Sequence, residues 1–448
     1  MLKYAKIYRK CRYHLPKSNL TPHPSIFKLL LLGGLLVANA SASAEQAHMA
    51  DQFVDSVGVN AHFDFYNSPY YLHFKDIIIP AFKSSGIRHV RFAAFNTPTA
   101  ATTNVATLIS TLRSYNGTRI GLDLVEFPST CPLTNDIRTS GNLSWVSYTN
   151  IDYFEGLNEY NGSNNPCGGN WYDNDRSFQK ALWNKVQYDK SGVAVLGPSL
   201  YGTLSTYASQ IGNLYSPQYE TYGNDHSYPY NGGPPSNNIH GYQTGQAVMN
   251  GSLPFVTSET GYPTDPGLVN NSSISYRAHG KYFSRLWFEY FNAGSVRTFS
   301  YELIDDPVAA GPVSEQHLGL LDQHGNPKPG FTAISNEIAL LKDPGHNFTP
   351  GALNYTLINA PSQVHHTLLQ KRDGRFYLAL WQEVASFKQQ CCDITNSSVA
   401  VTVKFANTMN TVNQYNPIAS ATAFATSRTV SSLTVSVPDQ AIILEIIP

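Results

Sequence analysis

The sequence contains little charge of either sign. Only 14% of its 448 residues are Asp, Glu, Lys or Arg, whereas about 25% is usual for soluble domains. The 30 basic and 31 acidic residues nearly cancel, so the chain has no basic field for nucleic acid and no acidic surface for a cationic partner. We therefore expect no nucleic-acid partner, and the polar surface must come mainly from uncharged residues.

Cysteine is also scarce, with five residues in the chain. Cys11 falls in the N-terminal segment, and neither a CxxC pair nor a histidine cluster accompanies the other four, which argues against a metal site. Four cysteines allow three pairings. We favour a disulfide between Cys131 and Cys167, because both fall in loops that would follow neighbouring strands. Cys391 and Cys392 have two alternatives, a vicinal disulfide or two reduced thiols.

The N-terminal apolar run is too short to span a bilayer, which takes about 20 residues as a helix. It covers residues 29–37, after a basic segment and before small residues that end at Ala44. This order is typical of a cleaved secretory signal. We expect residues 1–44 to be a signal peptide and the mature chain to be secreted or periplasmic, with no membrane segment. An uncleaved anchor is the alternative.

From about residue 52, short apolar runs alternate with longer segments of helical periodicity. This rhythm favours a parallel sheet, and eight right-handed repeats close most simply into a barrel. We therefore predict a (β/α)8 TIM barrel over residues 45–345. The predicted strands span residues 56–63, 89–92, 119–127, 151–157, 193–197, 223–227, 254–258 and 296–301, and the clearest helical patterns span residues 104–115, 176–190, 274–292 and 331–341.

The pattern changes near residue 346, where helical periodicity ends and short alternating strands begin. We predict an antiparallel β-sandwich domain over residues 346–448. This domain either braces the barrel or acts as a carbohydrate-binding module. The second alternative depends on Tyr377 and Trp381, which also suit a sandwich core.

Two glutamates fall where predicted strands end. The fourth strand is followed by Asn158-Glu159 and the seventh by Glu259. Catalytic groups of a (β/α)8 barrel lie at the C-terminal ends of its strands, so both carboxylates should face one mouth. Glycoside hydrolysis uses such a pair, one acid to protonate the leaving oxygen and one carboxylate to attack the anomeric carbon. Either glutamate alone would be an ordinary solvated loop acid.

This pair of strand ends resembles clan A glycoside hydrolases, which are retaining enzymes on a (β/α)8 barrel. The resemblance implies that Glu159 is the acid/base and Glu259 the nucleophile, and that Asn158 contacts the 2-hydroxyl of the sugar. It extends over about residues 52–345. The stretches that begin at Tyr301, Leu318 and Asn326 are similar to bacterial secreted members with an appended β-sandwich, and family 39 is the family that the chain resembles.

Other predicted strand ends carry residues to which the same resemblance gives a place in substrate binding. Arg91 ends the second strand, where clan members use an arginine to keep the nucleophile ionised. His226 and Tyr228 end the sixth strand on one face, and the tyrosine hydroxyl would touch the nucleophile. Tyr301 ends the eighth strand, where many members have tryptophan as a floor for the sugar. Asn60 on the first strand would line the mouth. For each of these residues, an ordinary structural role is the alternative.

The resemblance implies double displacement through a glycosyl-enzyme on a poly- or oligosaccharide, with no cofactor. Carboxyl groups about 5–5.5 Å apart would mean retention, and a gap above about 6.5 Å would mean inversion. We expect the negative charge of Glu259 to raise the pKa of Glu159, so that Glu159 is protonated before reaction. The sequence does not identify the sugar or the linkage, nor exo or endo action.

The main alternative is a catalytically inactive carbohydrate-binding barrel. A metal hydrolase would need a cluster of His and Asp ligands. The adjacent pair His365-His366 lies in a predicted strand, where neighbouring side chains point to opposite faces. The GxSxG motif of a serine hydrolase is absent. We expect the protein to be a monomer.

Overall fold

The computed structural model describes residues 43–138, 143–162, 165–202, 205–265, 267, 273–309 and 313–448. Apart from its last two residues, the predicted signal peptide lies outside these residues. Residues 41–448 belong to one compact unit. None of the helices in the described part of the chain is both long and apolar enough to cross a membrane.

The first sheet consists of eight parallel strands in the order β7-β6-β5-β4-β3-β10-β9-β8. The order closes on itself, because a parallel bridge between Leu196 and Tyr222 joins the end of β7 to the residue before β8. The predicted barrel is therefore confirmed, with small shifts at the strand ends. Its strands are β3 Val57–Asn60, β4 His89–Ala93, β5 Gly121–Glu126, β6 Ile151–Leu157, β7 Ala194–Leu196, β8 Gly223–Asp225, β9 Phe255–Thr260 and β10 Ser295–Ser300.

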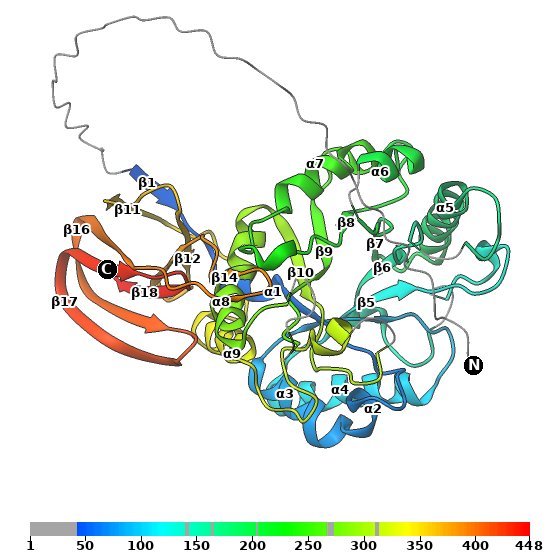
Figure 1. Cartoon of the computed structure of the whole chain (residues 1–448), viewed down its shortest axis with the longest axis horizontal. Helices are drawn as coiled ribbons and strands as arrows, with labels where there is room; N and C mark the ends of the chain where they lie inside the picture. The colour runs from blue at the N-terminus through cyan, green and yellow to red at the C-terminus, as the bar shows by residue number, and fades with distance from the viewer. Residues whose placement is uncertain are drawn as a thin grey trace, which may run out of the picture. The chain divides into compact units, whose positions relative to one another are not determined.

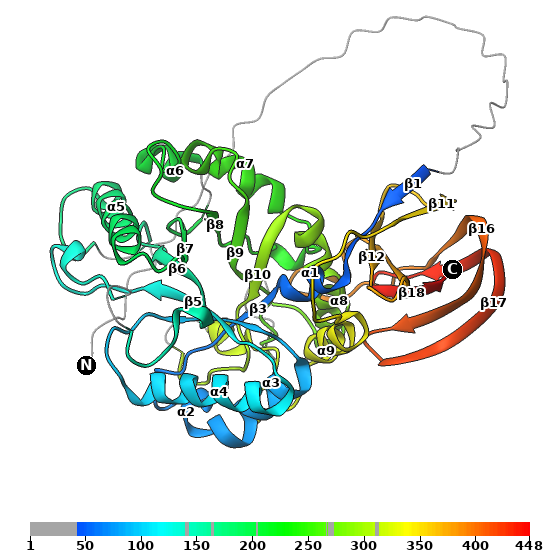
Figure 2. The same ribbon diagram turned by 180° about the vertical axis from the view of Figure 1, so that it is seen from behind.

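Helices surround these strands (Figures 1 and 2). They are α1 Ala50–Asp55, α2 Pro69–Leu72, α3 Ile79–Ser85, α4 Ala100–Asn116, α5 Trp171–Asp189, α6 Ser205–Ile211, α7 Ile239–Asn250, α8 Tyr276–Asn292 and α9 Pro329–Leu341. Helix α8 is buried on all sides from Ala278 to Tyr290, because it packs against the barrel on one face and against the second domain on the other. Shorter helices are η1 Phe74–Ile78, η2 Leu133–Asn135, η3 Tyr148–Asn150, η4 Tyr230–Gly232 and η5 Val313–His317.

The second sheet folds over on itself to make a sandwich. Its order is β1-β11-β16-β18-β13-β12-β2, with β17 paired to β16. The first half of β16 pairs with β11 and its second half with β18, so this long strand passes from one layer to the other. Its strands are β1 Ser43–Gln46, β2 His48–Met49, β11 Ala352–Ile358, β12 Val364–Gln370, β13 Phe376–Gln382, β16 Val399–Asn416, β17 Ser420–Val437 and β18 Ile442–Ile447.

Two details of this sheet differ from the sequence prediction. The prediction of short strands is wrong for β16 and β17, which span 18 residues each. The N-terminal strands β1 and β2 also join the sheet, and β2 pairs in parallel with β12. Residues 43 and 44, which were assigned to the signal peptide, therefore belong to β1. The small residues of β1 resemble a signal cleavage site. The sequence does not reveal that β1 pairs with β11, because the two strands are some 300 residues apart.

Strand β13 shows how the sandwich is fixed to the barrel. Leu378 and Leu380 point into the sandwich core, whereas Tyr377, Ala379 and Trp381 lie in the cluster shared with the barrel helices. Both aromatic side chains are buried, so the carbohydrate-binding alternative that depended on them is contradicted. The second domain instead braces the barrel.

Both cysteine pairs are bonded. Cys131 and Cys167 form a disulfide with their Cα atoms 5.5 Å apart, which agrees with the predicted pairing. Cys391 and Cys392 form the vicinal disulfide, one of the two alternatives. The vicinal pair lies at the hairpin of β14 Phe387–Lys388 and β15 Cys392–Asp393.

Candidate active site

The candidate site lies at the C-terminal ends of the barrel strands. Asn158 and Glu159 follow β6, and Glu259 is the fifth residue of β9. The backbone of Glu159 has a positive φ of 46°, a conformation that is costly for a residue with a side chain and is found disproportionately at functional sites. Its N–H donates to the carbonyl oxygen of Ser199 at 3.0 Å, which fixes this turn to the segment after β7.

Arg91 on β4 is the central cation of the site. Its guanidinium is buried. It donates from Nη1 to Glu259 Oε1 at 2.6 Å and from Nη2 to Asn158 Oδ1 at 2.6 Å. Nη1 also donates to Asn60 Oδ1 at 3.0 Å. The predicted contact between Arg91 and the seventh-strand glutamate is therefore present, and the same side chain also orients Asn158 and Asn60.

Two residues from the end of β8 complete the surroundings of Glu259. The Tyr228 hydroxyl donates to Glu259 Oε2 at 2.9 Å, which is the contact expected from the sequence. His226 Nδ1 lies 3.5 Å from the same oxygen. With Arg91 on the other oxygen, both oxygens of Glu259 have a polar partner, and the carboxylate is held in one orientation.

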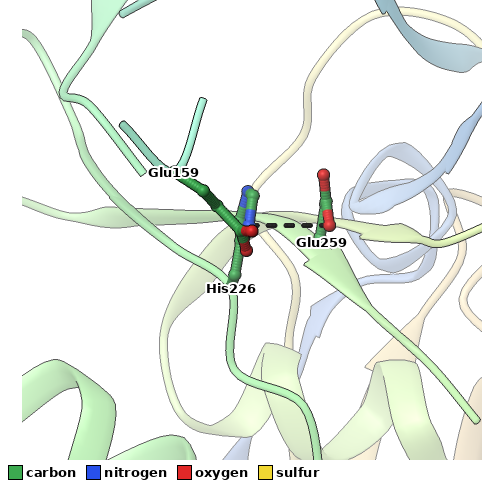
Figure 3. A group of neighbouring side chains, drawn as sticks. All are labelled: Glu159, His226 and Glu259. Carbon is green, nitrogen blue, oxygen red and sulfur yellow. Dashed lines mark hydrogen bonds and ion pairs between the residues drawn. The ribbon is translucent and has the colours of Figure 1, made fainter. Parts of the chain in front are cut away.

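His226 contacts both glutamates, and Figure 3 shows the three side chains together, with the longer contact to Glu259 as a dashed line. Its shorter contact is with Glu159. Nδ1 lies 2.7 Å from Glu159 Oε1. One oxygen of Glu159, one oxygen of Glu259 and one nitrogen of His226 all lie within 4.8 Å of one another. Glu159 is the more accessible acid, with 29% of its side chain exposed against 11% for Glu259. The structure thus brings the two predicted carboxylates together, one open to solvent and one enclosed.

The pKa of Glu159 differs from the sequence prediction. Burial alone would raise this pKa, but the hydrogen bond and charge of His226 outweigh burial and lower it. The expected upward shift is therefore wrong for this arrangement. Burial alone would lower the pKa of His226, yet the charge of Glu259 and the hydrogen bond to Glu159 raise it. Between Glu159 and His226 the proton therefore favours the imidazole.

Tyr301 directly follows β10. Its ring is half-buried and makes an edge contact with the His62 ring, with the two centroids 5.3 Å apart. Burial, and then the charges of Glu302 and Glu259, raise the pKa of the Tyr301 hydroxyl, which is therefore neutral at ordinary pH. A neutral phenol can donate a hydrogen bond at this edge of the site.

Sequence reasoning gave no role to three buried residues that connect the site. Glu155 on β6 accepts two hydrogen bonds from Arg91, at 2.7 and 2.8 Å. Asn224 Nδ2 and the Ser258 hydroxyl donate to Glu155 Oε1 at 2.9 and 3.2 Å. One signal was available in the sequence: strand alternation points Glu155 into the barrel. A buried acid needs a partner, so this position indicates a polar contact inside the barrel.

Glu302, which follows Tyr301 after β10, is not the solvated loop acid that its position in the sequence would allow. It is fully buried, and burial raises its pKa well above the usual value. The Tyr70 hydroxyl donates to Glu302 Oε2 at 2.8 Å, and His62 Nε2 lies 3.6 Å from the same oxygen. The group lies behind Tyr301 and supports that edge of the site.

Within the described part of the chain, Glu159, His226 and Glu259 are the one group whose spacing would suit a metal ion. Arg91 already holds a full positive charge 2.6 Å from Glu259. A divalent cation beside this guanidinium would be repelled. The chemistry of the group therefore favours acid, base and nucleophile over metal ligands.

No protein-family model matches the sequence, and comparison with curated proteins finds no match. Solved structures do match. A family 39 glycoside hydrolase from Bacteroides cellulosilyticus WH2 has a TM-score of 0.58 at 13% identity, over 89% of this chain and 82% of that chain. A glucosidase from Croceicoccus marinus has a TM-score of 0.58 at 10% identity, over 91% of this chain and 98% of that one.

A third solved structure, a family 39 enzyme from Xanthomonas axonopodis pv. citri, has a TM-score of 0.57 at 12% identity, over 93% of this chain and 100% of that chain. At these identities the likeness concerns the fold. The chain has the fold of family 39 glycoside hydrolases, a (β/α)8 barrel with a β-sandwich, as the resemblance at the strand ends implied.

Proposed function

We propose that this protein is a retaining glycoside hydrolase that cleaves an O-glycosidic bond of a poly- or oligosaccharide. The observation that carries the proposal is the pair of carboxylates at the barrel mouth, with one oxygen of Glu159 and one of Glu259 within 4.8 Å of each other. Retaining enzymes hold their two carboxyl groups about 5–5.5 Å apart, whereas inverting enzymes leave room for a water between them.

The surroundings of each carboxylate support different roles. Glu259 is held in one orientation by hydrogen bonds from Arg91 and Tyr228, which suits the nucleophile. Glu159 is more exposed and shares a contact with a protonatable histidine, which suits the acid/base. Asn158, fixed by Arg91, would reach the 2-hydroxyl, a contact that strengthens in the transition state.

The reaction then takes two steps. Glu259 forms a bond to the anomeric carbon, while the bond from that carbon to the leaving oxygen breaks and Glu159 gives this oxygen a proton. Glu159, now ionised, removes a proton from a water whose oxygen attacks the same carbon and releases Glu259. Because His226 Nδ1 lies 2.7 Å from Glu159, we infer that the imidazole supplies the proton that Glu159 passes on.

The proposal is tested with purified residues 45–448 on aryl glycosides and diverse polysaccharides. Glu159→Gln and Glu259→Gln should each lower kcat by about 10⁴-fold or more, with native circular dichroism. Glu337→Gln is the matched control, because this buried glutamate lies on α9, away from the mouth. Proton NMR of the first sugar released should show retained anomeric configuration.

Three outcomes would change the assignment. Activity that survives Glu259→Gln would exclude it as nucleophile, and loss of activity on chelation would favour the metal-hydrolase alternative. Tight binding of a glycan with no cleavage by the parent protein would support the inactive carbohydrate-binding barrel.

We also propose that the protein is exported after removal of an N-terminal signal, and that it acts as a monomer. The export proposal depends on the sequence pattern of residues 1–44. Glu45, the first residue after the expected cleavage point, accepts a hydrogen bond from Tyr355 at 2.5 Å and pairs with His366 at 3.0 Å. The mass of the exported chain would test the cleavage point, and light scattering would test the monomer.

A further inference from the structure

Glu155 is linked to both carboxylates of the pair by separate chains of hydrogen bonds. On one side it accepts from Arg91 Nε and Nη2, and the remaining Nη1 of the same guanidinium donates to Glu259. On the other side it accepts from the Ser258 hydroxyl, whose oxygen lies 3.0 Å from His226 Nε2. His226 Nδ1 in turn contacts Glu159.

The direction of the second chain follows from the proton inventory. Glu155 is ionised, because burial would raise its pKa but the charge and hydrogen bonds of Arg91 outweigh burial and lower it. An ionised carboxylate only accepts, so the single hydroxyl proton of Ser258 points to Glu155. The Ser258 oxygen can then only accept from His226, so Nε2 carries a proton. Nδ1 is therefore the nitrogen that gains and loses a proton, and it faces Glu159.

We propose that Glu155 is a positioning residue for both catalytic carboxylates. Through Arg91 it sets the orientation of Glu259, and through Ser258 it selects the His226 tautomer that places the exchangeable proton against Glu159. Its negative charge also offsets part of the Arg91 charge that acts on Glu259. This role rests on the proposed glycosidase function and extends it.

Asp123 on β5 lies beside Glu155 and can mask its role. It is fully buried, and burial and then the charge of Glu155 raise its pKa well above the usual value. If Glu155 becomes neutral, its charge no longer raises the pKa of Asp123, and Asp123 can ionise in place of Glu155. The test therefore includes Asp123→Asn. The remaining titratable and charged groups around the pair stay constant in every variant; they are Arg91, His226, Tyr228, Tyr301, Glu302 and Glu315.

The first measurement is the pH profile of kcat/KM for Glu155→Gln, alone and combined with Asp123→Asn. Removal of a buried negative charge makes ionisation of both neighbouring carboxyls easier. Both limbs of the profile should move to lower pH by about 1–2 units, and kcat should fall by about 10- to 100-fold. Glu155→Asp, which keeps the charge, should return the limbs toward those of the parent. Glu337→Gln should leave the profile unchanged.

The second measurement needs no substrate. NMR titration of His226 in ¹⁵N-histidine-labelled protein, assigned with His226→Gln, should show an Nε2–H tautomer when neutral. In the double variant the histidine should titrate at lower pH, because a stabilising negative charge is gone. If Glu155→Gln does not fold, Ser258→Ala removes the hydrogen-bonded link between Glu155 and His226 and leaves the link through Arg91 in place. The neutral His226 of this variant should then show both tautomers.

A fall in kcat with unmoved pH limbs and an unchanged His226 titration would overturn the proposal, since that is the result of a merely structural role. A parent protein that cleaves no glycan, yet whose His226 responds as described, would overturn the glycosidase proposal and leave the electrostatic link intact. A parent protein that is active, while neither the His226 titration nor the pH limbs change in the Glu155 variants, would overturn the positioning role of Glu155 and leave the glycosidase proposal intact.

Discussion

The two ends of the barrel each contain a cluster of charged side chains, and the two clusters are composed differently. At the N-terminal end of the strands, Asp55 and Asp152 are bridged by His89 and by Arg297, at distances between 2.5 and 3.1 Å. Arg119 adds a further contact to Asp152 at 2.7 Å. Here two carboxylates have three basic side chains as partners.

At the C-terminal mouth the ratio is reversed. Glu155, Glu159 and Glu259 share one arginine, Arg91, and one histidine, His226. The carboxylates at the first end have enough partners for every charge, whereas those at the mouth compete for theirs. Groups that compete for a proton or a cation change state when a substrate arrives, and groups that are fully paired resist change. The comparison explains why one end is suited to stability and the other to chemistry, the usual division in this fold.

The largest expected difference comes from removing the arginine of each end. Arg297→Met leaves two carboxylates without their shared cation, so the free energy of unfolding should fall by about 3–5 kcal/mol, while kcat/KM of the folded protein stays the same. Arg91→Met should lower kcat/KM by about 10³-fold or more, because Glu259 and Asn158 lose their orientation. Denaturant unfolding and steady-state kinetics on both variants test the contrast.

If Arg297→Met impaired turnover in protein shown to be folded, the division between the two ends would fail. Arg88→Met is a suitable control at the first end, because Arg88 pairs mainly with Asp51 and lies 3.9 Å from Asp55. It should cost less stability than Arg297→Met.

The second expected effect is a dependence of stability on acid pH that originates at the first end. Burial would raise the pKa of Asp152, but the charge of His89, then those of Arg297 and Arg119, lower it from 3.8 to about 2. A lowered pKa means that the native state favours the ionised form. Its contribution, about 2 kcal/mol, is therefore complete above about pH 4 and is lost as the pH falls from 4 to 2.

Urea midpoints between pH 2 and 5 measure this loss. The Asp152→Asn variant should be less stable at pH 5 and should show a flatter pH dependence across the same range. Equal slopes for the parent and the variant would show that other carboxylates cause the acid sensitivity.

The residues at the mouth could be located from the sequence, whereas only some of their contacts could be. The hydrophobic pattern located the ends of the eight strands, so Arg91, Glu159, His226 and Glu259 could be identified from their positions at or just after these ends. Chain order within a parallel barrel fixes which residues share an end. The predicted roles of these residues remain proposals, but their placement at one mouth is observed.

The remaining contacts depend on side-chain geometry that spacing does not encode. His226 was expected only to share a face with Tyr228, yet it lies 2.7 Å from Glu159. This contact gives the pKa of Glu159 the direction opposite to the expected one. Strand alternation places Glu155 inside the barrel, but it does not identify Arg91 and Ser258 as its partners. The contacts of Asp152 join residues 33 to 145 positions apart, so they form only in the folded barrel.

The smallest expected effect comes from Glu315, a third carboxyl near the pair at the mouth. Burial, and then the charges of Glu259 and Glu159, raise its pKa to about 7. Above that pH its charge should help Glu159 to retain a proton. Glu315→Gln removes the charge, so its kcat/KM should match the parent at pH 5 and fall below it by less than about tenfold at pH 8. A ratio that is the same at both pH values would show that Glu315 does not act on the pair through its charge, and would confine the electrostatic competition at the mouth to Glu155, Glu159 and Glu259.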